Sequence, residues 1–453
     1  MSITVPSINL TTRRPTTALI SLGLVAILVH SILLFFVIPT FTSRLMPFYG
    51  QDRYVDGYDQ IAANLVAGNG YRFYPETAKT LMREPGYPML LAGIQFLFGN
   101  TFLAVKLTNM LLALVAAWLM TLIARRLTNN QAVILVAPVL YLFHPGTLIA
   151  ESRGGVEVLF TALITLFIVT LYRATERNRQ WDYVASGAVL GLTVLVKSTP
   201  MLFPVFLLAY FLVCQRGRTP KLVASGRVAL MVIAMFVVLS PWISRNYILT
   251  GRFVPTASVL GVSAHAGQYI CTHLGDDKSW MELDREAARE RAKLAKQLGY
   301  PFEDDIYYQT FYNSNDELNF SGYLTRRVIH DYRMSPVLFV RCVRSNIFNF
   351  WFTGKTVRST RTNVVIQLPY LILAVMGVLL CVKNNQSSII GPVAVFIIYF
   401  VAVHIPILAQ ARYSMPLIPF LSIFSGLALA EAHERLGRLG GVFVERNAPL
   451  LEK

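Results

Sequence analysis

The sequence predicts an all-α protein that crosses a membrane about ten times and carries a small, mainly helical domain on one side. Hydrophobic residues make up 54% of the 453 positions and charged residues only 15%, and the mean hydropathy is +0.50. A soluble core cannot bury that much apolar surface. In addition, the apolar runs alternate with clusters of basic residues, as in polytopic membrane proteins.

Apolar windows of about 20 residues separate these charge clusters and define the expected spans. The first window is too long for a signal-peptide core and lacks a small-residue cleavage site, so we expect it to remain as an anchor. Several of the others are shorter than the ideal length. The predicted spans are 18–41, 101–124, 131–148, 154–172, 183–197, 199–214, 226–246, 364–382, 388–406 and 412–430.

The basic clusters predict the orientation of the chain. The formal charge of +16 does not indicate nucleic-acid binding, because many of the bases punctuate apolar runs. Lysine and arginine remain on the cytoplasmic side of membrane spans, which places both termini inside and both long polar segments outside. The clusters that mark the inner side are Arg13/Arg14, Arg125/Arg126, Arg173/Arg177/Arg179 and Arg216/Arg218/Lys221.

Three parts of the chain follow from this order. Residues 1–247 form an N-terminal transmembrane module whose first external loop, 42–98, carries the candidate site; residues 248–363 form an extracytoplasmic domain; residues 364–453 supply the last spans and a cytoplasmic tail. Within 42–98, "YDQIAANLV" has the spacing of a short interfacial helix. Within 248–363, "WMELDREAARERAKLAKQLG" predicts a helix that stops near Gly299, and a disulfide between Cys271 and Cys342 is possible.

The first external loop holds equal numbers of acids and bases between Thr42 and Glu84, so its charge is not a simple topological signal. Asp52, Asp56 and Asp59 follow the first span, where a partly desolvated carboxylate can act as a general base. The alternative for each is a helix cap or a solvated face. In "REPGYP", the prolines suit the first turn of a helix, and Arg83 beside that helix start suits a phosphate. Glu84 is a candidate second acid, and an interfacial anchor is the alternative for this motif.

Other candidate substrate-binding residues lie at predicted outer ends of spans. Basic residues there run against the positive-inside tendency, although each alone is more often a structural, snorkelling side chain. These candidates are Tyr58, Tyr87, Glu151, Lys197, Arg245, Asn246, Arg412 and Tyr413. We expect no cofactor to be required. A divalent metal is possible, with His265 as a weak candidate ligand, although a single histidine is more often an ordinary hydrogen-bonding residue.

Several motifs together resemble the GT-C glycosyltransferases, and most closely the glycosyltransferase family 39-like group of protein O-mannosyltransferases and lipid A aminoarabinose transferases. These motifs are "YDQIAANLVAGNGY", "REPGYPMLLAGIQFLFG" and "ARRL", followed by "GLTVLVKSTP", "SPWISRNYILTGRFVP" and "ARYSMPLIPF". The likeness covers residues 18–430, is most specific between Asp52 and Leu127, and fades between Ile270 and Thr360.

The resemblance implies an enzyme of the bacterial cytoplasmic membrane that uses a polyprenyl-phosphate sugar on the extracytoplasmic face. It implies an inverting displacement, an aspartate base in the first external loop, and basic residues on the leaving phosphate. Asp56 is the preferred base. Family members often place the acid where this chain has Tyr54, so Asp52 remains a rival, and many have arginine where this chain has Lys197. The acceptor is a glycan, a lipid or a protein.

Two other functions remain open from the sequence. A transporter or flippase for a lipid-linked glycan would place ionisable groups at mid-span and show inverted repeats. Here the charges lie at span ends and the two halves do not match, which favours the enzyme. A non-catalytic relative that only binds a lipid-linked glycan is the third possibility, and replacement of Asp56 separates it from an enzyme.

Overall fold

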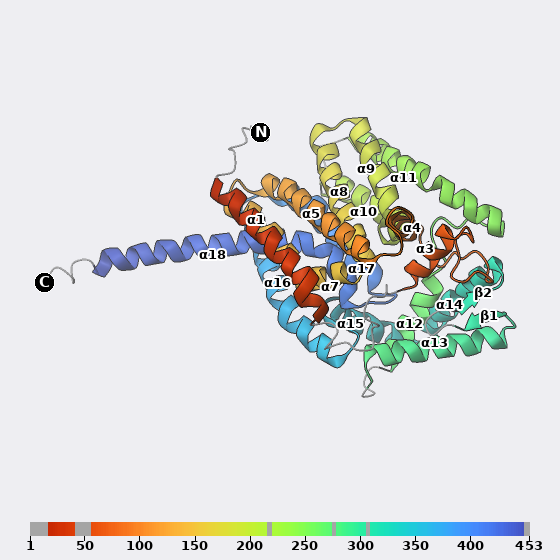
Figure 1. Ribbon diagram of the computed structural model, residues 1–453. Helices are drawn as coiled ribbons and strands as arrows, with labels where there is room; N and C mark the ends of the chain where they lie inside the picture. The colour runs from red at the N-terminus through yellow and green to blue at the C-terminus, as the bar shows by residue number, and fades with distance from the viewer. Residues whose placement is uncertain (1–16, 41–55, 215–219, 274–277, 305–308, 448–453) are drawn as a thin grey trace.

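The computed structural model shows a bundle of helices with a smaller helical module at one end (Figure 1). The structure describes residues 17–40, 56–214, 220–273, 278–304 and 309–447. In chain order the elements are α1 (Thr17–Ile32), η1 (Leu33–Val37), α3 (Tyr58–Val66), α4 (Gly86–Phe98), α5 (Phe102–Leu127), α6 (Gln131–Leu142), α7 (Pro145–Ser152), α8 (Val156–Arg177), α9 (Gln180–Val196), η2 (Thr199–Leu202), α10 (Phe203–Val213), α11 (Lys221–Thr250), α12 (Leu260–Thr272), α13 (Trp280–Gln297), β1 (Phe302–Asp304), β2 (Gln309–Phe311), α14 (Ser314–Met334), α15 (Pro336–Phe352), α16 (Val357–Lys383), α17 (Ser387–His404), η3 (Ala411–Leu417) and α18 (Ile418–Asn447).

Among the described residues, six helices are long and apolar enough to cross a membrane, or seven if one bent pair counts as a single span. The prediction of a polytopic all-α protein is confirmed, but the count of ten is not. Shorter apolar helices account for part of the difference: Gly86–Phe98, Thr199–Val213 and Ile389–His404. The six long helices are Gly23–Thr40, Phe102–Leu127, Val156–Arg177, Lys221–Thr250, Val357–Lys383 and Ala411–Leu436.

Two apolar segments are interrupted next to a proline, whose backbone nitrogen has no hydrogen to donate. α6 and α7 meet at a bend of 50°, where His144 caps the start of α7 and Pro145 occupies its first turn. Proline suits that position because its missing N–H has no intrahelical partner there. Likewise, η2 carries Pro200 in its first turn and separates α9 from α10. Because of the bend between α6 and α7, the number of apolar spans among the described residues is six or seven.

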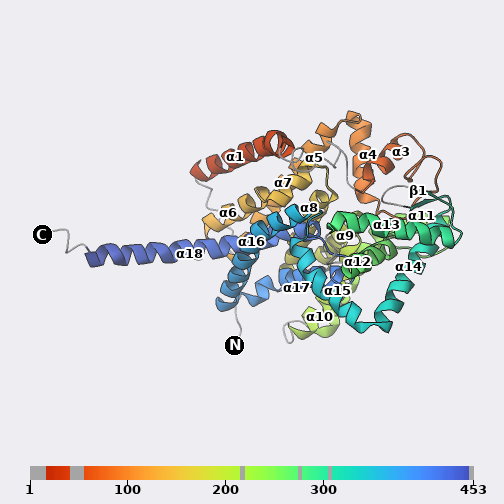
Figure 2. The same ribbon diagram turned by 90° about the horizontal axis from the view of Figure 1, so that it is seen from below.

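Helix pairs pack around one continuous apolar core. α9 lies against α11 and α8, while α18 lies against α16 and α6; α18 also extends well beyond the body of the bundle (Figures 1 and 2). The approach of α9 to α11 is close because Gly187 faces the backbone of Met231, where a β-carbon would collide with the carbonyl oxygen. Small residues permit such close contact between helices in membranes.

The module formed by α12 to α15 with β1 and β2, hereafter the α12–α15 module, lies at one end of the bundle (Figure 1). Its predicted central helix is confirmed: α13 begins with a capping box between Ser279 and Glu282, and Gly299 follows its end with φ +74°. β1 pairs with β2 antiparallel, Phe302 opposite Phe311. The possible disulfide is present, since Cys271 of α12 is bonded to Cys342 of α15.

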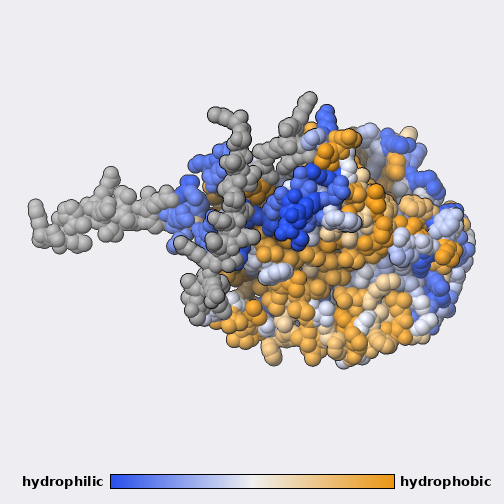
Figure 3. Space-filling model, turned by 90° about the horizontal axis from the view of Figure 1, so that it is seen from above, coloured by the Kyte–Doolittle hydropathy of each residue, from blue (hydrophilic) through white to orange (hydrophobic). Residues whose placement is uncertain are grey.

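A broad hydrophobic surface covers one face of the body, with hydrophilic residues gathered beside it (Figure 3). Many large apolar side chains on the long helices are exposed, including Leu24, Trp118, Ile233 and Val365. Lipid, rather than water, is the solvent for such a surface, so the chain is an integral membrane protein. The three-part division stays a prediction; its two boundaries fall within α11 and α16.

Candidate active site

A carboxylate and a guanidinium from opposite ends of the chain meet at the centre of the candidate site. Arg412 Nη1 lies 2.8 Å from Asp56 Oδ2, and Arg412 Nη2 lies 3.4 Å from Asp56 Oδ1. The side chains are 18% and 27% exposed for Asp56 and Arg412 respectively. This two-point pairing fixes both orientation and distance, which a lysine ammonium does not do.

Local backbone conformation directs Asp56 toward this pair. Asp56 has φ 88° and Gly57 has φ 70°, so the chain makes a left-handed turn immediately before α3. Aspartate is among the few residues other than glycine that adopt this conformation readily. Arg412 lies in η3, whose 3₁₀ geometry precedes the long helix α18 and contains Pro416.

The pKa of Asp56 lies below its usual range. Burial opposes ionisation of this carboxyl, but the charges of Arg412, Arg83 and Lys197, together with the hydrogen bond from Arg412, outweigh that effect. The carboxylate is therefore ionised at neutral pH. A carboxylate held by arginine in this way is also a weak base until the arginine is drawn elsewhere.

Arg83 and Glu84 hold the loop that carries Asp56. Arg83 Nε donates to the backbone oxygen of Asp56 at 3.2 Å, and its guanidinium lies 5.5 Å from the ring centroid of Tyr58. Glu84 is buried, and its carboxylate accepts the backbone N–H of Ser198 at 3.0 Å. Glu84 therefore ties this loop to the end of α9 next to Lys197.

The prolines of "REPGYP" start α4 as predicted, with Pro85 at its N-cap. Gly86 lets this start approach α9, because a β-carbon there would lie 2.7 Å from Val196 Cγ2 and 2.9 Å from the carbonyl oxygen of Leu195. No larger residue fits without moving one of the two helices. The close approach places Arg83 and Lys197 on the same side of the structure.

Lys197 and Arg412 converge on one aromatic ring. Lys197 Nζ lies 5.5 Å from the centroid of Tyr413, and Arg412 Cζ lies 5.3 Å from it. Lys197 Nζ is also 3.3 Å from Glu157 Oε1, in the first turn of α8. The site thus contains two cations near the ring of Tyr413, and each is paired with a carboxylate.

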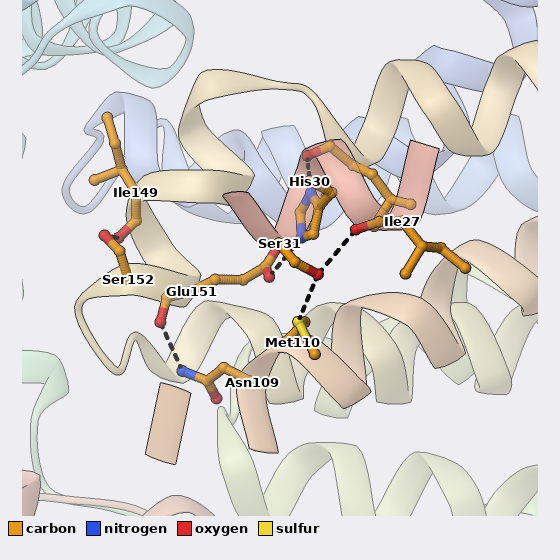
Figure 4. Close-up of polar contacts among 9 residues, drawn as sticks. Ile27, His30, Ser31, Asn109, Met110, Ile149, Glu151 and Ser152 are labelled. Carbon is orange, nitrogen blue, oxygen red and sulfur yellow. Dashed lines mark hydrogen bonds and ion pairs between the residues drawn. The ribbon is translucent and has the colours of Figure 1, made fainter. Parts of the chain in front are cut away.

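Three other predicted site residues contact neighbouring helices. Glu151 is fully buried, and His30 Nε2 lies 3.0 Å from its Oε2, so Glu151 joins α7 to α1 (Figure 4). Figure 4 also shows the amide of Asn109 donating to the backbone oxygen of Glu151. The buried Tyr87 donates its hydroxyl to the carbonyl of Gly154, and Tyr58 packs edge-on against Tyr87 with ring centroids 5.4 Å apart.

Arg245 and Asn246 support the loop from a distance. Arg245 Nη1 donates to the carbonyl of Thr80 at 3.0 Å, and its guanidinium lies 4.5 Å from the Trp242 ring. The side chain of Asn246 donates to the backbone oxygens of Val254 and Thr256. Both residues therefore fix the backbone around the site and are not shown to line it.

Two further predictions have limited structural context. Asp52, the rival base, lies outside the described residues. His265 is buried in α12, where burial and the charges of Arg291 and Arg327 lower its pKa to about 3. Across the described part of the chain, no group of three or more histidine, cysteine, aspartate or glutamate side chains is arranged to hold a metal ion. A divalent metal stays a prediction.

The α12–α15 module adds two charges that the sequence did not reveal. Burial raises the pKa of Asp284 in α13, an effect that Arg291 and Arg412 oppose and Asp56 reinforces. Burial and the charge of Arg412 lower the pKa of Lys355 to about 7. Asp284 lies within a charge-dense helix, and Lys355 lies in the short link before α16. Neither residue belongs to a sequence motif that would indicate a functional site.

One carboxylate joins the α12–α15 module to the loop. Glu317 of α14 accepts hydrogen bonds from Thr80 Oγ1 at 2.8 Å, Leu81 N at 2.9 Å and Ser258 Oγ at 2.6 Å. Leu81 is two residues before Arg83, so the position of the candidate site depends on this contact. A buried carboxylate with three donors is well satisfied, whereas removal of it leaves three donors without partners.

The chain is similar to known glycosyltransferases over part of its length. Residues 82–244 match the family model described as dolichyl-phosphate-mannose-protein mannosyltransferase. A 165-residue stretch is 32% identical to undecaprenyl phosphate-alpha-4-amino-4-deoxy-L-arabinose arabinosyl transferase 1 of Pseudomonas fluorescens (strain Pf0-1) and covers 35% of this chain. The match spans only 28% of that relative's length.

Solved structures extend the likeness to the fold. The oligosaccharyltransferase of Archaeoglobus fulgidus, tethered with an acceptor peptide, superposes with a TM-score of 0.54 at 14% identity, covering 93% of this chain and 50% of that one. ArnT of Cupriavidus metallidurans bound to undecaprenyl phosphate gives a TM-score of 0.40 at 13% identity, covering 90% and 78%. The chain is therefore similar in fold to the archaeal oligosaccharyltransferase, and residues 82–244 are similar in sequence to membrane glycosyltransferases.

Proposed function

We propose that the chain transfers a sugar from a polyprenyl-phosphate donor to an acceptor hydroxyl on the extracytoplasmic face of the bacterial cytoplasmic membrane. The observation that carries this proposal is the pair formed by Asp56 and Arg412 with Lys197 beside it. A base next to two cations is the arrangement that an inverting displacement on a phosphate-linked sugar requires.

The reaction needs one proton acceptor and one site for the leaving phosphate. The acceptor oxygen attacks the anomeric carbon while its proton passes to Asp56. The bond between that carbon and the phosphate oxygen breaks, and its electron pair remains on the polyprenyl phosphate. Arg412 and Lys197 stabilise the growing negative charge, so no acid is needed to protonate the leaving group.

Donor binding also prepares the base. Arg412 keeps the pKa of Asp56 low. The phosphate of a bound donor competes with Asp56 for the guanidinium of Arg412. When Arg412 pairs with that phosphate instead, the pKa of the Asp56 carboxyl rises. The base therefore gains strength when the donor is in place. Glu84 and Arg83 act as positioning residues, since they hold the Asp56 loop against α9.

The family match and the curated relative support the donor class. The description of the matched family specifies a dolichyl-phosphate sugar, and the name of the relative specifies an undecaprenyl-phosphate sugar. Both are polyprenyl phosphates, and the apolar helices provide a surface for a long prenyl chain. The sugar is a hexose or a pentose, and the acceptor is a glycan, a lipid or a protein.

The test is turnover by the purified protein with a panel of polyprenyl-phosphate sugars, comparing wild type with Asp56→Asn. We expect the variant to lose at least about 10²-fold in transfer rate. Donor binding should persist or become tighter, because Arg412 no longer has a carboxylate partner. Asp59→Asn, in the first turn of α3, is the matched control and should retain transfer.

Two results would contradict the proposal. If turnover is unchanged in Asp56→Asn, Asp56 is not the base, and Asp52→Asn is the next variant to test. Absence of turnover with every donor, combined with movement of the lipid-linked sugar across vesicle membranes, identifies a transporter instead.

A further inference from the structure

A cavity of about 770 Å³ lies beside the candidate active site, between the start of α13, the second half of α15 and the start of α16. Its wall includes Thr353 and Gly354, and the carbonyl of Thr353 accepts the N–H of Ala411, the neighbour of Arg412. The Asp56 site and this cavity therefore adjoin one another, but the lining of the cavity includes neither Asp56 nor Arg412. The proposed transfer reaction makes no use of it.

Three arginines give the cavity a concentrated positive charge. Arg341 and Arg344 of α15 and Arg361 of α16 line it, and all three are exposed. Their side chains form no hydrogen bond or ion pair with any residue that the structure describes. Lys278 also lines the cavity but is paired with Glu286 at 2.9 Å. An unbalanced cluster of guanidinium groups favours an anion with several acceptor oxygens.

The start of α16 adds to this preference. Thr356 caps the helix through a capping box with Ser359, and Thr356 and Thr360 both line the cavity. The helix dipole places partial positive charge at this end. The hydroxyl of Ser345 and the amide of Asn349 contribute further polar groups to the lining. Charge and hydrogen-bonding capacity therefore both suit a phosphate.

An apolar rim indicates that the anion is attached to a lipid. Phe348 and Val357 line the cavity and are 48% and 55% exposed. The same face of α15 presents Val337 and Val340, which are 72% and 63% exposed. α16 is one of the long apolar helices, so the cavity lies at the boundary of a span. Exposed apolar residues beside arginines at such a boundary suit acyl chains beside a headgroup.

We propose that this cavity is a binding site for the phosphate-bearing headgroup of a membrane lipid, separate from the site of the transfer reaction. Its walls are held together without the ligand. The disulfide between Cys271 and Cys342 links α12 to α15, and the N–H of Met281 donates to the carbonyl of Lys355 at 3.1 Å. The inference does not depend on the proposed glycosyl transfer.

The test is native mass spectrometry of the full-length protein in detergent, titrated with phosphatidylglycerol. The site variant is Arg341→Gln/Arg344→Gln/Arg361→Gln. Its control is Arg289→Gln/Arg326→Gln/Arg333→Gln, which removes the same charge from exposed positions on α13 and α14. We expect the affinity for the tightest-bound lipid to fall at least about tenfold in the site variant. In the control it should change less than about twofold.

Further measurements distinguish a lipid headgroup from a soluble phosphate, and binding at this cavity from an effect of the overall net charge. Inorganic phosphate at millimolar concentration should not displace the bound lipid; displacement, with the same arginine dependence, would assign the cavity to a soluble phosphorylated ligand. Equal losses in the two triple variants would show that overall charge alone attracts the lipid. If the site variant unfolds, Arg344→Gln alone should still weaken binding about threefold, and unchanged binding in that variant would overturn the proposal.

Discussion

Asp56 illustrates how one backbone angle sets the chemistry of a site. Its left-handed conformation aims the carboxylate at Arg412, a residue 356 positions away. The consequence is a carboxylate that is ionised but weakly basic without a donor. In the proposed mechanism, Arg412 pairs first with the base and then with the leaving group, which couples proton transfer to donor binding and limits wasteful activation of water.

Lys355 leads to a pH-dependence prediction at the residue scale. Burial and Arg412 lower its pKa to about 7, so the ammonium is charged below that pH and neutral above it. Because Lys355 contributes to the positive potential around Arg412, affinity for a polyprenyl-phosphate donor should fall as the pH rises from 6 to 8.

Donor titrations across that pH range in Lys355→Arg provide the check. Arginine stays protonated throughout, so the variant should lose the step near pH 7. Lys383→Arg, at the other end of α16, should retain the wild-type profile. The same pH step in Lys355→Arg would assign it to another group.

The pairing of α9 with α11 connects packing to the site at the scale of elements. Gly187 and Gly191 place the backbone of α9 against Met231 and Met235 of α11. α9 ends at Val196, and Lys197 follows directly. A shift of α9 therefore moves Lys197 relative to Tyr413.

We expect Gly187→Ala to destabilise the protein by about 1–3 kcal/mol, because the new β-carbon forces the two helices apart. It should also raise the KM for the donor more than it lowers kcat, since Lys197 is the proposed ligand of the donor phosphate. Thermal unfolding and steady-state kinetics measure both effects. Gly226→Ala in α11, where the added methyl group meets open space, should be close to neutral; similar losses in both variants would contradict this account.

At the scale of the whole molecule, the disulfide closes a loop of 71 residues across the α12–α15 module. Its loss in Cys271→Ser/Cys342→Ser should lower the free energy of unfolding of this module by about 4 kcal/mol, because the unfolded chain becomes less restricted.

Thermal unfolding with and without a reductant measures this contribution. Reductant should lower the unfolding temperature of the wild type and of Cys214→Ser, whose thiol is free, but not that of the double variant. An unfolding temperature that does not respond to reductant in any of the three proteins would contradict the assignment.

Much of the architecture followed from the sequence. Apolar windows and basic clusters predicted the long helices, and capping patterns predicted α13 and the start of α4. The number of spans did not follow, because hydropathy windows do not show the bend at His144 or that Thr199–Val213 and Ile389–His404 are shorter than the long helices.

The residues of the candidate site were predictable only in part from the sequence. Charges at the ends of spans are unusual enough to indicate Asp56, Arg83, Lys197 and Arg412, and the structure brings these together. The same signal also indicates Glu151, which the structure pairs with the buried His30, a contact that the sequence does not reveal. Asp284 and Lys355 depend on how the α12–α15 module folds back on the bundle.

The contacts of Glu317 have a consequence for biogenesis. Its carboxylate receives donors from residues 236 and 237 positions earlier in the chain, so the Asp56 loop cannot reach its final shape until α14 has been synthesised. The partner of Asp56 arrives later still, with η3. A nascent chain that stops short of Arg412 therefore carries the aspartate without its arginine, and the candidate site is assembled only at the end of insertion.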